Sequence, residues 1–316
     1  EVHPETRIYN LDIVEPGTPL PTVKNYKPAL GKGEEHAATF IYCDVRQPIE
    51  LEKVNITPDD VIFNFAAVHR TPGHPDPAYF ETNIRGAENV CAFAERHGIR
   101  KIVFTSSIAP YGAAEELKEE TTLPMPNTPY GISKLVAEKI HQTWQAGGEG
   151  RQLTIVRPGV VFGRGENGNF TRLYWGIRGH KFMYPGRKDT IKACIYVKEL
   201  VRFMLYRLEH HDSGVELYNC CYEPAYTIEH IVESMKRVTN MKVKVPFMPG
   251  WLIMTAAGIA GALGSPMGIC PARVRKLQIS TNICGKKLSA SGYRFRYTFE
   301  EALADWYKDN GNLYLQ

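Results

Sequence analysis

The first half of the chain alternates short apolar runs with longer segments whose apolar residues recur at helical spacing. The apolar runs are residues 7–12, 39–45, 61–67, 101–107 and 153–161. Their continuous apolar character is typical of strands that are buried on both faces of a parallel sheet. Helical spacing covers residues 76–97, with Ala87 and Phe93 as candidate core positions, and residues 130–146. This alternation predicts an α/β fold with a doubly wound parallel sheet.

Acidic, small or hydroxyl-bearing residues stand at the carboxyl ends of the predicted strands. They are Asp12, Asp44, Ala67, Ser107 and Pro158. Doubly wound sheets bind ligands outside these strand ends, so we expect the five residues to converge on one crevice. His69 follows the third strand and would face a substrate there, although a histidine in such a loop is commonly just solvated.

The second half of the chain has a different residue composition and pattern. Gly, Asn, Arg and aromatic residues fill residues 163–187, which predicts an excursion from the sheet. A strand and a helix are expected to return at 195–207, and amphipathic helices are expected at 227–238 and 298–308. The predicted domains are a sheet domain of residues 1–165 and 188–223 and a smaller substrate-binding lobe of residues 166–187 and 224–316.

Composition and charge narrow the classes of function. With 316 residues, 43% of them hydrophobic and 23% charged, the chain is typical of a folded globular protein. A net charge of +4 without long Lys/Arg runs argues against nucleic acid and suits an anionic small substrate. The apolar run 251–264 is shorter than the ~20 residues of a spanning helix, so we expect no membrane span. Seven cysteines without metal-ligand spacing predict reduced thiols, no metal site and a cytoplasmic protein.

Tyr130 and Lys134 form a candidate proton-transfer pair. Four residues apart where a helix begins, they would share one helix face. A tyrosine hydroxyl titrates near ~10, so it acts at neutral pH only where a nearby positive charge favours the phenolate. The same spacing recurs at Tyr184 and Lys188, but there the residues between them are Pro-Gly-Arg, which predicts a turn with no common face.

Asp12 is a candidate ribose ligand, because an acid at such a strand end has this role in dinucleotide-binding folds. The alternative is a solvated loop acid. In those folds a G-x-G-x-x-G turn stands ~20 residues before the acid, which here lies before residue 1. We therefore expect that Glu1 is not the natural start of the protein.

Further motifs follow in a fixed order along nearly the whole chain. After Asp12 they are Cys43-Asp44-Val45, Phe65-Ala66-Ala67, Asn83, Thr105-Ser106-Ser107, Tyr111-Gly112, Tyr130 to Lys134, Arg157-Pro158-Gly159 and Ile195-Tyr196-Val197. In this order they resemble the extended short-chain dehydrogenase/reductase superfamily, in particular its NAD-dependent epimerase/dehydratase branch. The resemblance implies a Rossmann fold whose sheet domain binds NAD.

The resemblance also implies which residues bind the cofactor. They would be Asp12, Asp44, Val45, Phe65, Ala66, Ala67, Asn83, Ser106, Tyr130, Lys134 and Pro158. Asp12 would hold the adenosine ribose and favour NAD over NADP. Taken singly, several of these residues have a structural alternative, such as a helix cap at Asn83 or a turn at Ser106.

The catalytic residues implied by the resemblance are Ser107, Tyr130 and Lys134. Tyr130 would be the acid/base, and Lys134 would bind the nicotinamide ribose and lower the tyrosine pKa. Hydride leaves a carbinol carbon only as its hydroxyl loses a proton, which requires such a phenolate and a hydroxyl donor. Dehydratases of this branch carry acidic residues directly after the catalytic hydroxyl, whereas Ser107 is followed by Ile108-Ala109-Pro110. We therefore expect a nucleotide-sugar 4-epimerase working through a keto intermediate, or a related sugar oxidoreductase.

The substrate would be a UDP-sugar of polysaccharide biosynthesis. The candidate residues are His69, Asn167, Asn169, Arg172, Arg187 and Lys192, whose cations suit a diphosphate and whose amides suit a sugar or base. Polar loop surface is the alternative for them. Val160 departs from many UDP-sugar epimerases, which carry Asn there. The resemblance also implies a homodimer through the helices near residues 78–97 and 130–146.

Two other functions stay open. The apolar Trp251-Leu252-Ile253-Met254 stretch within residues 246–264 resembles the lid of 3β-hydroxysteroid and sterol-type dehydrogenases, and core packing explains it equally well. A cofactor-binding module without turnover is the third function.

Overall fold

The computed structural model describes residues 6–16, 38–69, 73–212, 214–252, 255 and 278–316. Two compact units divide the chain. Unit 1 comprises Glu1–Gly112, Pro124–Arg157 and Met204–Tyr218, and unit 2 comprises Ala113–Leu123, Pro158–Phe203 and Asn219–Gln316. These bounds differ from the predicted domain bounds, mainly because residues 113–123, 158–165 and 188–203 belong to unit 2. The predicted assignment of cofactor and substrate to separate domains stays a prediction.

Unit 1 is built on parallel strands. Its strands are β1 (Ile8–Asp12), β2 (Ala38–Tyr42), β3 (Val61–Asn64), β4 (Lys101–Thr105), β6 (Gln152–Pro158) and β11 (Val215–Cys220), the last two ending just beyond the unit bounds. Strands β1 and β2 pair in parallel, and a second sheet has the order β11-β6-β4-β3, in which β3, β4 and β6 run parallel. The predicted strands are therefore confirmed, although four end earlier than expected, at Tyr42, Asn64, Thr105 and Pro158.

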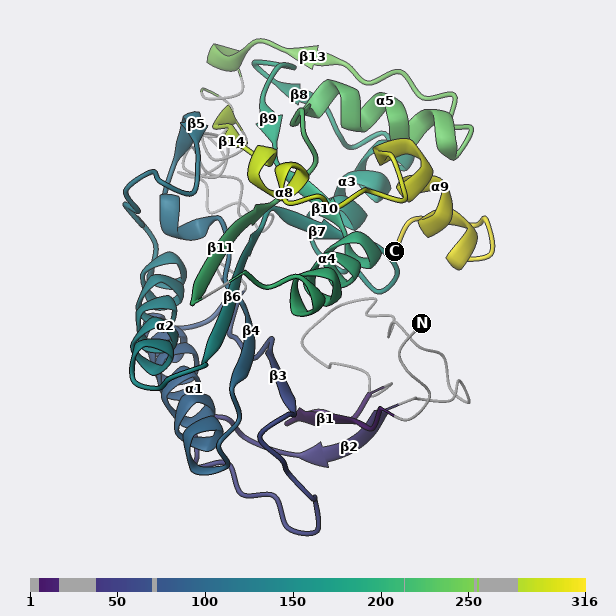
Figure 1. Cartoon of the computed structure of the whole chain (residues 1–316). Coiled ribbons are helices and arrows are strands. Elements are labelled where there is room, and N and C mark those ends of the chain that lie inside the picture. Colours follow the sequence, from purple (N-terminus) through teal and green to yellow (C-terminus); the bar gives the residue numbers. More distant parts are fainter. Residues whose placement is uncertain (1–5, 17–37, 70–72, 213, 253–254, 256–277) are drawn as a thin grey trace. The chain divides into compact units, whose positions relative to one another are not determined.

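Two helices lie side by side against this sheet (Figure 1). Helix α1 (Asp76–Arg96) begins after Pro75 with an acid in its first turn and ends with Arg96, which suits the helix dipole. Helix α2 (Pro129–Ala146) is capped by Thr128, whose side chain accepts a hydrogen bond from the Gly131 amide. Their buried faces join the strands in one core, whose members include Ala87, Val90, Phe93, Ile102, Phe104, Trp144, Leu153 and Ile155.

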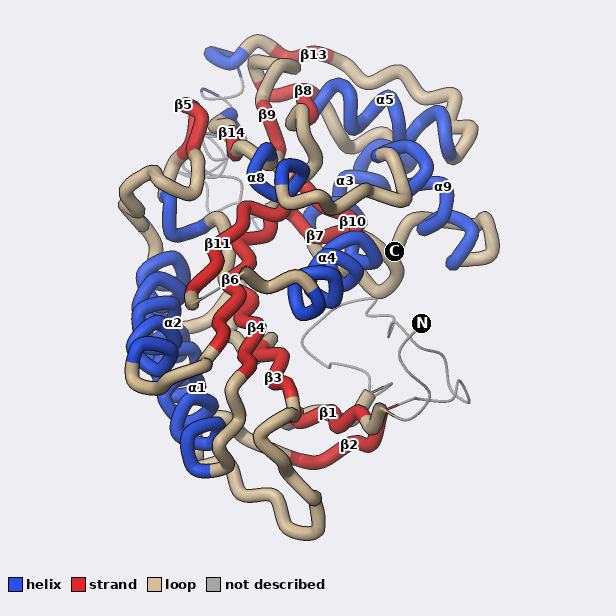
Figure 2. Tube along the Cα trace, in the orientation of Figure 1, coloured by secondary structure: helices blue, strands red, loops and turns tan. Residues whose placement is uncertain are grey.

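Unit 2 consists of short strands and helices (Figure 2). Its strands are β5 (Ala114–Lys118), β7 (Val160–Phe162), β8 (Tyr184–Pro185), β9 (Ile191–Lys192), β10 (Cys194–Tyr196), β12 (Tyr226–Thr227), β13 (Phe247–Met248) and β14 (Thr281–Ile283). Its helices are α3 (Asn169–Arg178), α5 (Ile228–Val238), α8 (Lys286–Ala290) and α9 (Phe299–Asp309), and α4 (Val197–Glu209) crosses the unit bound. An aromatic core that includes Phe162, Phe170, Tyr196, Phe299 and Trp306 holds unit 2 together.

Two of the helices predicted for the second half of the chain are confirmed, one further helix was not predicted, and part of the predicted apolar stretch is not described. The predicted helices near 227–238 and 298–308 are α5 and α9, and Thr227 and Thr298 cap them as Ncap residues should. Helix α3 was not predicted. Of the apolar residues 246–264, those at 253–254 and 256–264 lie outside the described residues, including Ile253 and Met254 of the stretch compared with steroid dehydrogenases. In the described part of the chain, no helix combines the length and apolar character needed to cross a membrane.

Candidate active site

The end of strand β4 meets one face of helix α2 through four successive residues. The contacting pairs are Phe104 with His141, Thr105 with Lys134, Ser106 with Glu138, and Ser107 with Tyr130. Residues 130, 134 and 138 are spaced four apart and so share one face of the helix. All of these residues belong to unit 1. The predicted catalytic residues are thus brought together by a strand end and the helix packed on it.

Tyr130 is half-buried, and its hydroxyl makes a hydrogen bond with Ser107. Burial raises the pKa of Tyr130, while the hydrogen bond from Ser107 acts in the opposite direction. The serine oxygen also accepts a bond of 3.1 Å from the Ala109 amide, which fixes it in place. The tyrosine pKa is thus raised in this structure, whereas a lowering by Lys134 was expected, because burial outweighs the groups that stabilise a phenolate.

Lys134 is almost completely buried, with 1% of its surface exposed. Its Nζ donates to the Thr105 carbonyl at 2.6 Å and lies 4.3 Å from the centre of the Phe104 ring. Burial lowers the pKa of Lys134 to about 7, while the carboxylate of Glu138 acts in the opposite direction. The bond to Thr105 uses one of the three ammonium N–H donors, so the other two can donate to the hydroxyls of a ligand.

A buried ion pair lies behind this cluster. Arg157, from strand β6, donates from Nε and Nη2 to the two carboxylate oxygens of Glu138 at 2.8 and 2.6 Å. The Ser106 hydroxyl donates to the same carboxylate at 2.5 Å. Ser106, predicted to bind the cofactor, is itself buried and occupied by this bond. Neither Glu138 nor the Arg157 side chain was predicted to be a site residue.

A second buried polar chain reaches the loop after strand β3. His141 Nδ1 lies 2.8 Å from the Ala137 carbonyl, so it carries the proton and donates there. Its Nε2 then accepts from the side-chain amide of Asn64 at 3.2 Å. The Asn64 side-chain oxygen accepts from the Ala66 amide at 3.2 Å, which ties the loop predicted to line NAD to helix α2. Burial lowers the pKa of His141 to about 4, which keeps the ring neutral.

Asn83 fixes the same loop from helix α1. Its side chain accepts from the Val68 amide at 2.8 Å and donates to the Val68 carbonyl at 3.1 Å. It also donates to the Ser133 hydroxyl at 2.8 Å, which links α1 to α2. With its amide engaged in these bonds, Asn83 holds the shape of the loop that carries Ala67 and His69.

The other cofactor candidates of unit 1 lie at the ends of β1, β2 and β3. Asp12 is the last residue of β1 and Asp44 follows the adjacent parallel strand β2, so the two acids lie at the same edge of this strand pair. Asp12 is exposed and accepts from the Val14 amide at 3.1 Å. The hydrogen bonds from Arg46 lower the pKa of Asp44, whose carboxylate Arg46 contacts with Nε and Nη2. Phe65 is 57% exposed, as a residue that contacts a ligand can be.

The remaining candidates belong to unit 2. Pro158 is buried at the end of β6, and Asn169 begins helix α3. Arg172 is exposed on that helix, and within the described ranges its one side-chain hydrogen bond runs from Nε to the Gly168 carbonyl, at 2.7 Å. Arg187 forms ion pairs with Asp189 and Glu115, at 2.9 and 3.0 Å. The other two are Asn167, bonded to Gly165 and Gln316, and Lys192, bonded to Ile279.

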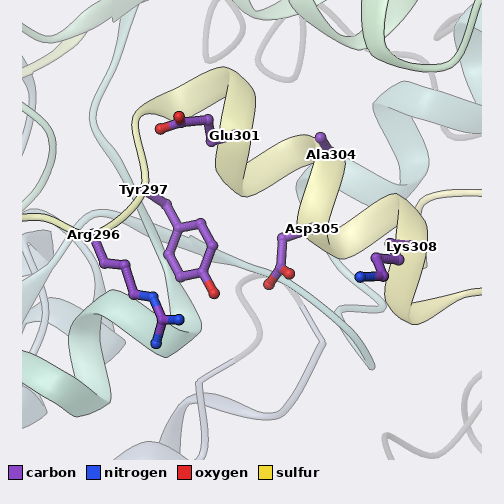
Figure 3. Close-up of a pocket in the computed structure, with 6 residues that line it drawn as sticks. All are labelled: Arg296, Tyr297, Glu301, Ala304, Asp305 and Lys308. Carbon is purple, nitrogen blue, oxygen red and sulfur yellow. The ribbon is translucent and has the colours of Figure 1, made fainter.

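A cavity of about 370 Å³ lies on helix α9, lined by Arg296, Tyr297, Glu301, Ala304, Asp305 and Lys308 (Figure 3). None of these residues is among the site candidates. Asp305 is engaged by the Tyr196 hydroxyl and by Lys198, both at 2.7 Å. The cavity therefore offers no chemistry that connects it with the residues at the end of β4.

Comparison with known proteins gives three kinds of likeness. Residues 15–221 match the model of the NAD dependent epimerase/dehydratase family. A protein of Escherichia coli O157:H7, named N-acetyl-alpha-D-glucosaminyl-diphospho-ditrans,octacis-undecaprenol 4-epimerase, is 32% identical over 266 residues, which cover 82% of this chain and 80% of that protein. A UDP-glucose 4-epimerase of Lacticaseibacillus casei is 33% identical over 250 residues, covering 69% and 73%.

Among solved structures, the UDP-glucuronic acid 4-epimerase of Bacillus cereus in complex with NAD superposes with a TM-score of 0.67. It is 18% identical and the alignment covers 89% of this chain and 81% of that one. At this identity the likeness concerns the fold, and it confirms the predicted α/β Rossmann class.

Proposed function

Because this chain belongs to the NAD dependent epimerase/dehydratase family, we propose that it is a 4-epimerase of a sugar that carries a diphosphate at its anomeric carbon. The family match confirms the predicted enzyme class and NAD dependence. The observation that carries the proposal is the cluster of Ser107, Tyr130 and the buried Lys134 at the end of β4. The names of the relatives support the sugar diphosphate as substrate.

The residues of unit 1 fit the cofactor that the family uses. Asp12 presents an exposed carboxylate at the end of a parallel strand, which suits a ribose hydroxyl. The buried ammonium of Lys134 has donors left for the nicotinamide ribose. When bound, NAD takes up a hydride from the sugar and later returns it. The cofactor-binding roles of Asp44, Val45, Phe65, Ala66 and Ala67 belong to this proposal.

The protein's own groups would move the proton. Tyr130 as the phenolate takes the proton of the sugar C4 hydroxyl while the carbon loses its hydride, which leaves a ketone at C4. Ser107 donates a hydrogen bond to the sugar oxygen during this step. After the ketone turns its other face, Tyr130 returns the proton to the oxygen as the hydride returns to carbon. Lys134 in its charged form favours the phenolate, against the burial that raises the tyrosine pKa.

Unit 2 would bind the rest of the substrate. Of its predicted cations, Arg172 is the one we propose for the diphosphate, because it is exposed and keeps both terminal nitrogens of its guanidinium for a ligand. The charge of Arg187 is already balanced by two carboxylates, and we expect it to order the segment around Glu115. Asn167 and Asn169 remain candidates for the sugar or base.

Product analysis tests this function. Purified protein with NAD would be incubated separately with UDP-glucose, UDP-N-acetylglucosamine and N-acetylglucosaminyl-diphospho-undecaprenol, and products would be identified by NMR. An epimer at C4 without accumulating NADH supports the proposal, and the substrate that reacts tells a nucleotide carrier from a polyprenol carrier. NADH formed with a 3-hydroxysteroid would instead establish a dehydrogenase. Tight NAD binding without any product would establish a binding module.

We also propose a cytoplasmic homodimer. Ile132 and Val136, one turn apart on helix α2, are 40% and 36% exposed, which gives this helix an apolar outer edge. Analytical ultracentrifugation should find a dimer, and Ile132→Glu with Val136→Glu should yield a monomer. A monomeric wild-type protein would overturn the dimer.

A further inference from the structure

Glu138 joins three elements behind the candidate catalytic cluster. It stands on α2, holds Arg157 of β6 through two hydrogen bonds, and accepts a bond from Ser106 at the end of β4. The side chains of Glu138 and Arg157 are 1% and 4% exposed. Because burying two charges costs about as much as their attraction returns, such a pair is weak evidence of a purely stabilising role.

The pair acts on geometry through Ser106. This serine immediately precedes Ser107, and its bond to Glu138 fixes the backbone from which the Ser107 hydroxyl reaches Tyr130. The preceding residue, Thr105, accepts the bond from Lys134 at 2.6 Å. One face of α2 therefore sets the position of three consecutive residues, and Glu138 holds the middle one.

Glu138 also acts on charge. Lys134 lies one turn before it on the same face and is 1% exposed. Within the described residues, Lys134 takes part in no ion pair. The titratable groups around it are Tyr130, His141 and Glu138 on α2, Arg157 on β6 and Tyr111 on η1 (Ala109–Tyr111). Of these only Glu138 carries a carboxylate, which Arg157 contacts as an ion pair.

We propose that Glu138 is a positioning residue of the proposed epimerase centre: it fixes Ser107 against Tyr130 through Ser106, and its carboxylate keeps the buried Lys134 protonated. This inference rests on the proposed function for the roles of Tyr130 and Lys134. Burial alone would deprotonate Lys134, and Glu138 opposes that effect. A neutral lysine could not favour a phenolate. With one donor engaged by the Thr105 carbonyl, the neutral amine would keep one N–H for a ribose, whereas the ammonium keeps two.

The test measures the charge of Lys134 directly, without substrate. In full-length protein labelled with ¹³Cε-lysine, the Lys134 resonance would be assigned with Lys134→Met and titrated by NMR. Glu138→Gln should lower the titration midpoint of Lys134 by roughly one pH unit or more. Glu138→Asp keeps the charge but shortens the side chain, so the midpoint should stay near that of wild type while kcat falls. Ser106→Ala should also lower kcat with an unchanged midpoint.

A second buried pair of unit 1 supplies the matched control. Arg207 and Glu216 have side chains 3% and 8% exposed and also form two hydrogen bonds. Glu216→Gln should destabilise the protein as Glu138→Gln does and leave the Lys134 midpoint unchanged. If Glu138→Gln does not fold, the double variant Glu138→Met with Arg157→Met removes both charges without leaving one unpaired. A smaller lowering is then expected, because the Arg157 cation, which disfavours a charged Lys134, is removed together with the carboxylate.

An unchanged midpoint in the variants that lack the Glu138 carboxylate would overturn the electrostatic part of the proposal. Full kcat in Ser106→Ala and Glu138→Asp would overturn the positional part. If wild-type protein shows no epimerisation of any sugar tested, the proposed function fails, but the NMR midpoint still reports whether Glu138 controls the charge of Lys134.

Discussion

At the scale of single residues, Tyr130 differs from Tyr184, the other tyrosine with a lysine four positions on, in the surroundings of its hydroxyl. Tyr130 bonds to Ser107 from the start of a helix, whereas Tyr184 lies in the short strand β8. Among the residues that the structure describes, the buried Tyr184 hydroxyl has no hydrogen-bond partner. The spacing alone could not separate the two. The helix predicted at Tyr130 is confirmed, whereas the turn predicted from Tyr184 begins with the two residues of strand β8.

We predict that Tyr130→Phe lowers kcat by roughly 100- to 10,000-fold, because it removes the group that we propose exchanges the C4 hydroxyl proton. Its dissociation constant for NAD, measured by calorimetry, should stay within a few-fold of wild type. Tyr184→Phe is the matched control, in which kcat should be unchanged. Loss of activity in both variants, or in neither, would contradict the assignment of Tyr130.

A second residue, His141, should make stability depend on pH. Its pKa falls from 6.5 to about 4 on folding because burial disfavours the charged ring. The unfolded chain therefore binds a proton that the folded chain does not between these values, so stability is full above pH 6.5 and falls toward pH 4. The linked loss is about 3 kcal/mol. Urea unfolding at several pH values should show a flatter profile for His141→Gln, but not for His210→Gln, which changes an exposed histidine.

At the scale of elements, helix α2 can approach the residues after β4 because Gly131 has no side chain. A Cβ at this position would lie 2.7 Å from the Ala109 carbonyl oxygen and 3.1 Å from Pro126. Either the helix or the Ala109 backbone, which bonds Ser107, would have to move.

We therefore predict that Gly131→Ala lowers kcat by about 10- to 100-fold through misplacement of Tyr130 relative to Ser107. Thermal unfolding should also show lower stability. Gly176→Ala in helix α3 is the control, since its Cβ would make an ordinary contact of 3.4 Å with Phe182. There alanine's higher helix propensity should raise stability by up to about 1 kcal/mol. Equal effects of the two substitutions would contradict the steric argument.

Elements with strong periodicity and terminal signals could be predicted from the sequence, and elements with buried polar residues could not. Helices α1 and α2 were predicted almost to the residue, because apolar spacing, prolines and Thr128 agree on their limits. Strand β11 was missed because Glu216 and Asn219 interrupt its apolar pattern, and both are buried with hydrogen-bond partners. In α3 the spacing of Phe170, Tyr174 and Ile177 was present but was hidden among glycines and arginines.

In the candidate site too, residues in local motifs could be predicted from the sequence, whereas a pairing between distant elements could not. Ser107, Tyr130 and Lys134 could be predicted because their motifs and spacing involve residues that are close together in the sequence. The pairing of Glu138 with Arg157 depends on the register of β6 against β4, in which Thr105 lies beside Val156, and no spacing along the chain reports it. A sign was nevertheless present, since Glu138 continues the face of Tyr130 and Lys134 by one more turn.

At the scale of the whole molecule, each unit has its own hydrophobic core, so a ligand bound to one unit need not stabilise the other. We proposed NAD-binding residues mainly in unit 1, around residues 64–69 and 105–107, and substrate cations in unit 2. Hydrogen exchange followed by mass spectrometry can separate these contributions, because amides that exchange through opening of a unit slow down when a ligand holds that unit closed.

We predict that NAD at about 100 times its dissociation constant slows exchange in α1, α2 and the segments after β3 and β4 by up to about 100-fold, which corresponds to about 2.7 kcal/mol. Helices α5 and α9, whose side chains pack in the core of unit 2, should exchange as before. Adding UDP-glucose or the polyprenol-linked sugar should then slow exchange in α3, where Arg172 lies, and Arg172→Ala should abolish that second effect while leaving the first. Slowing in α9 with NAD alone, or none near residues 64–69, would show that the cofactor and substrate residues are assigned to the wrong units.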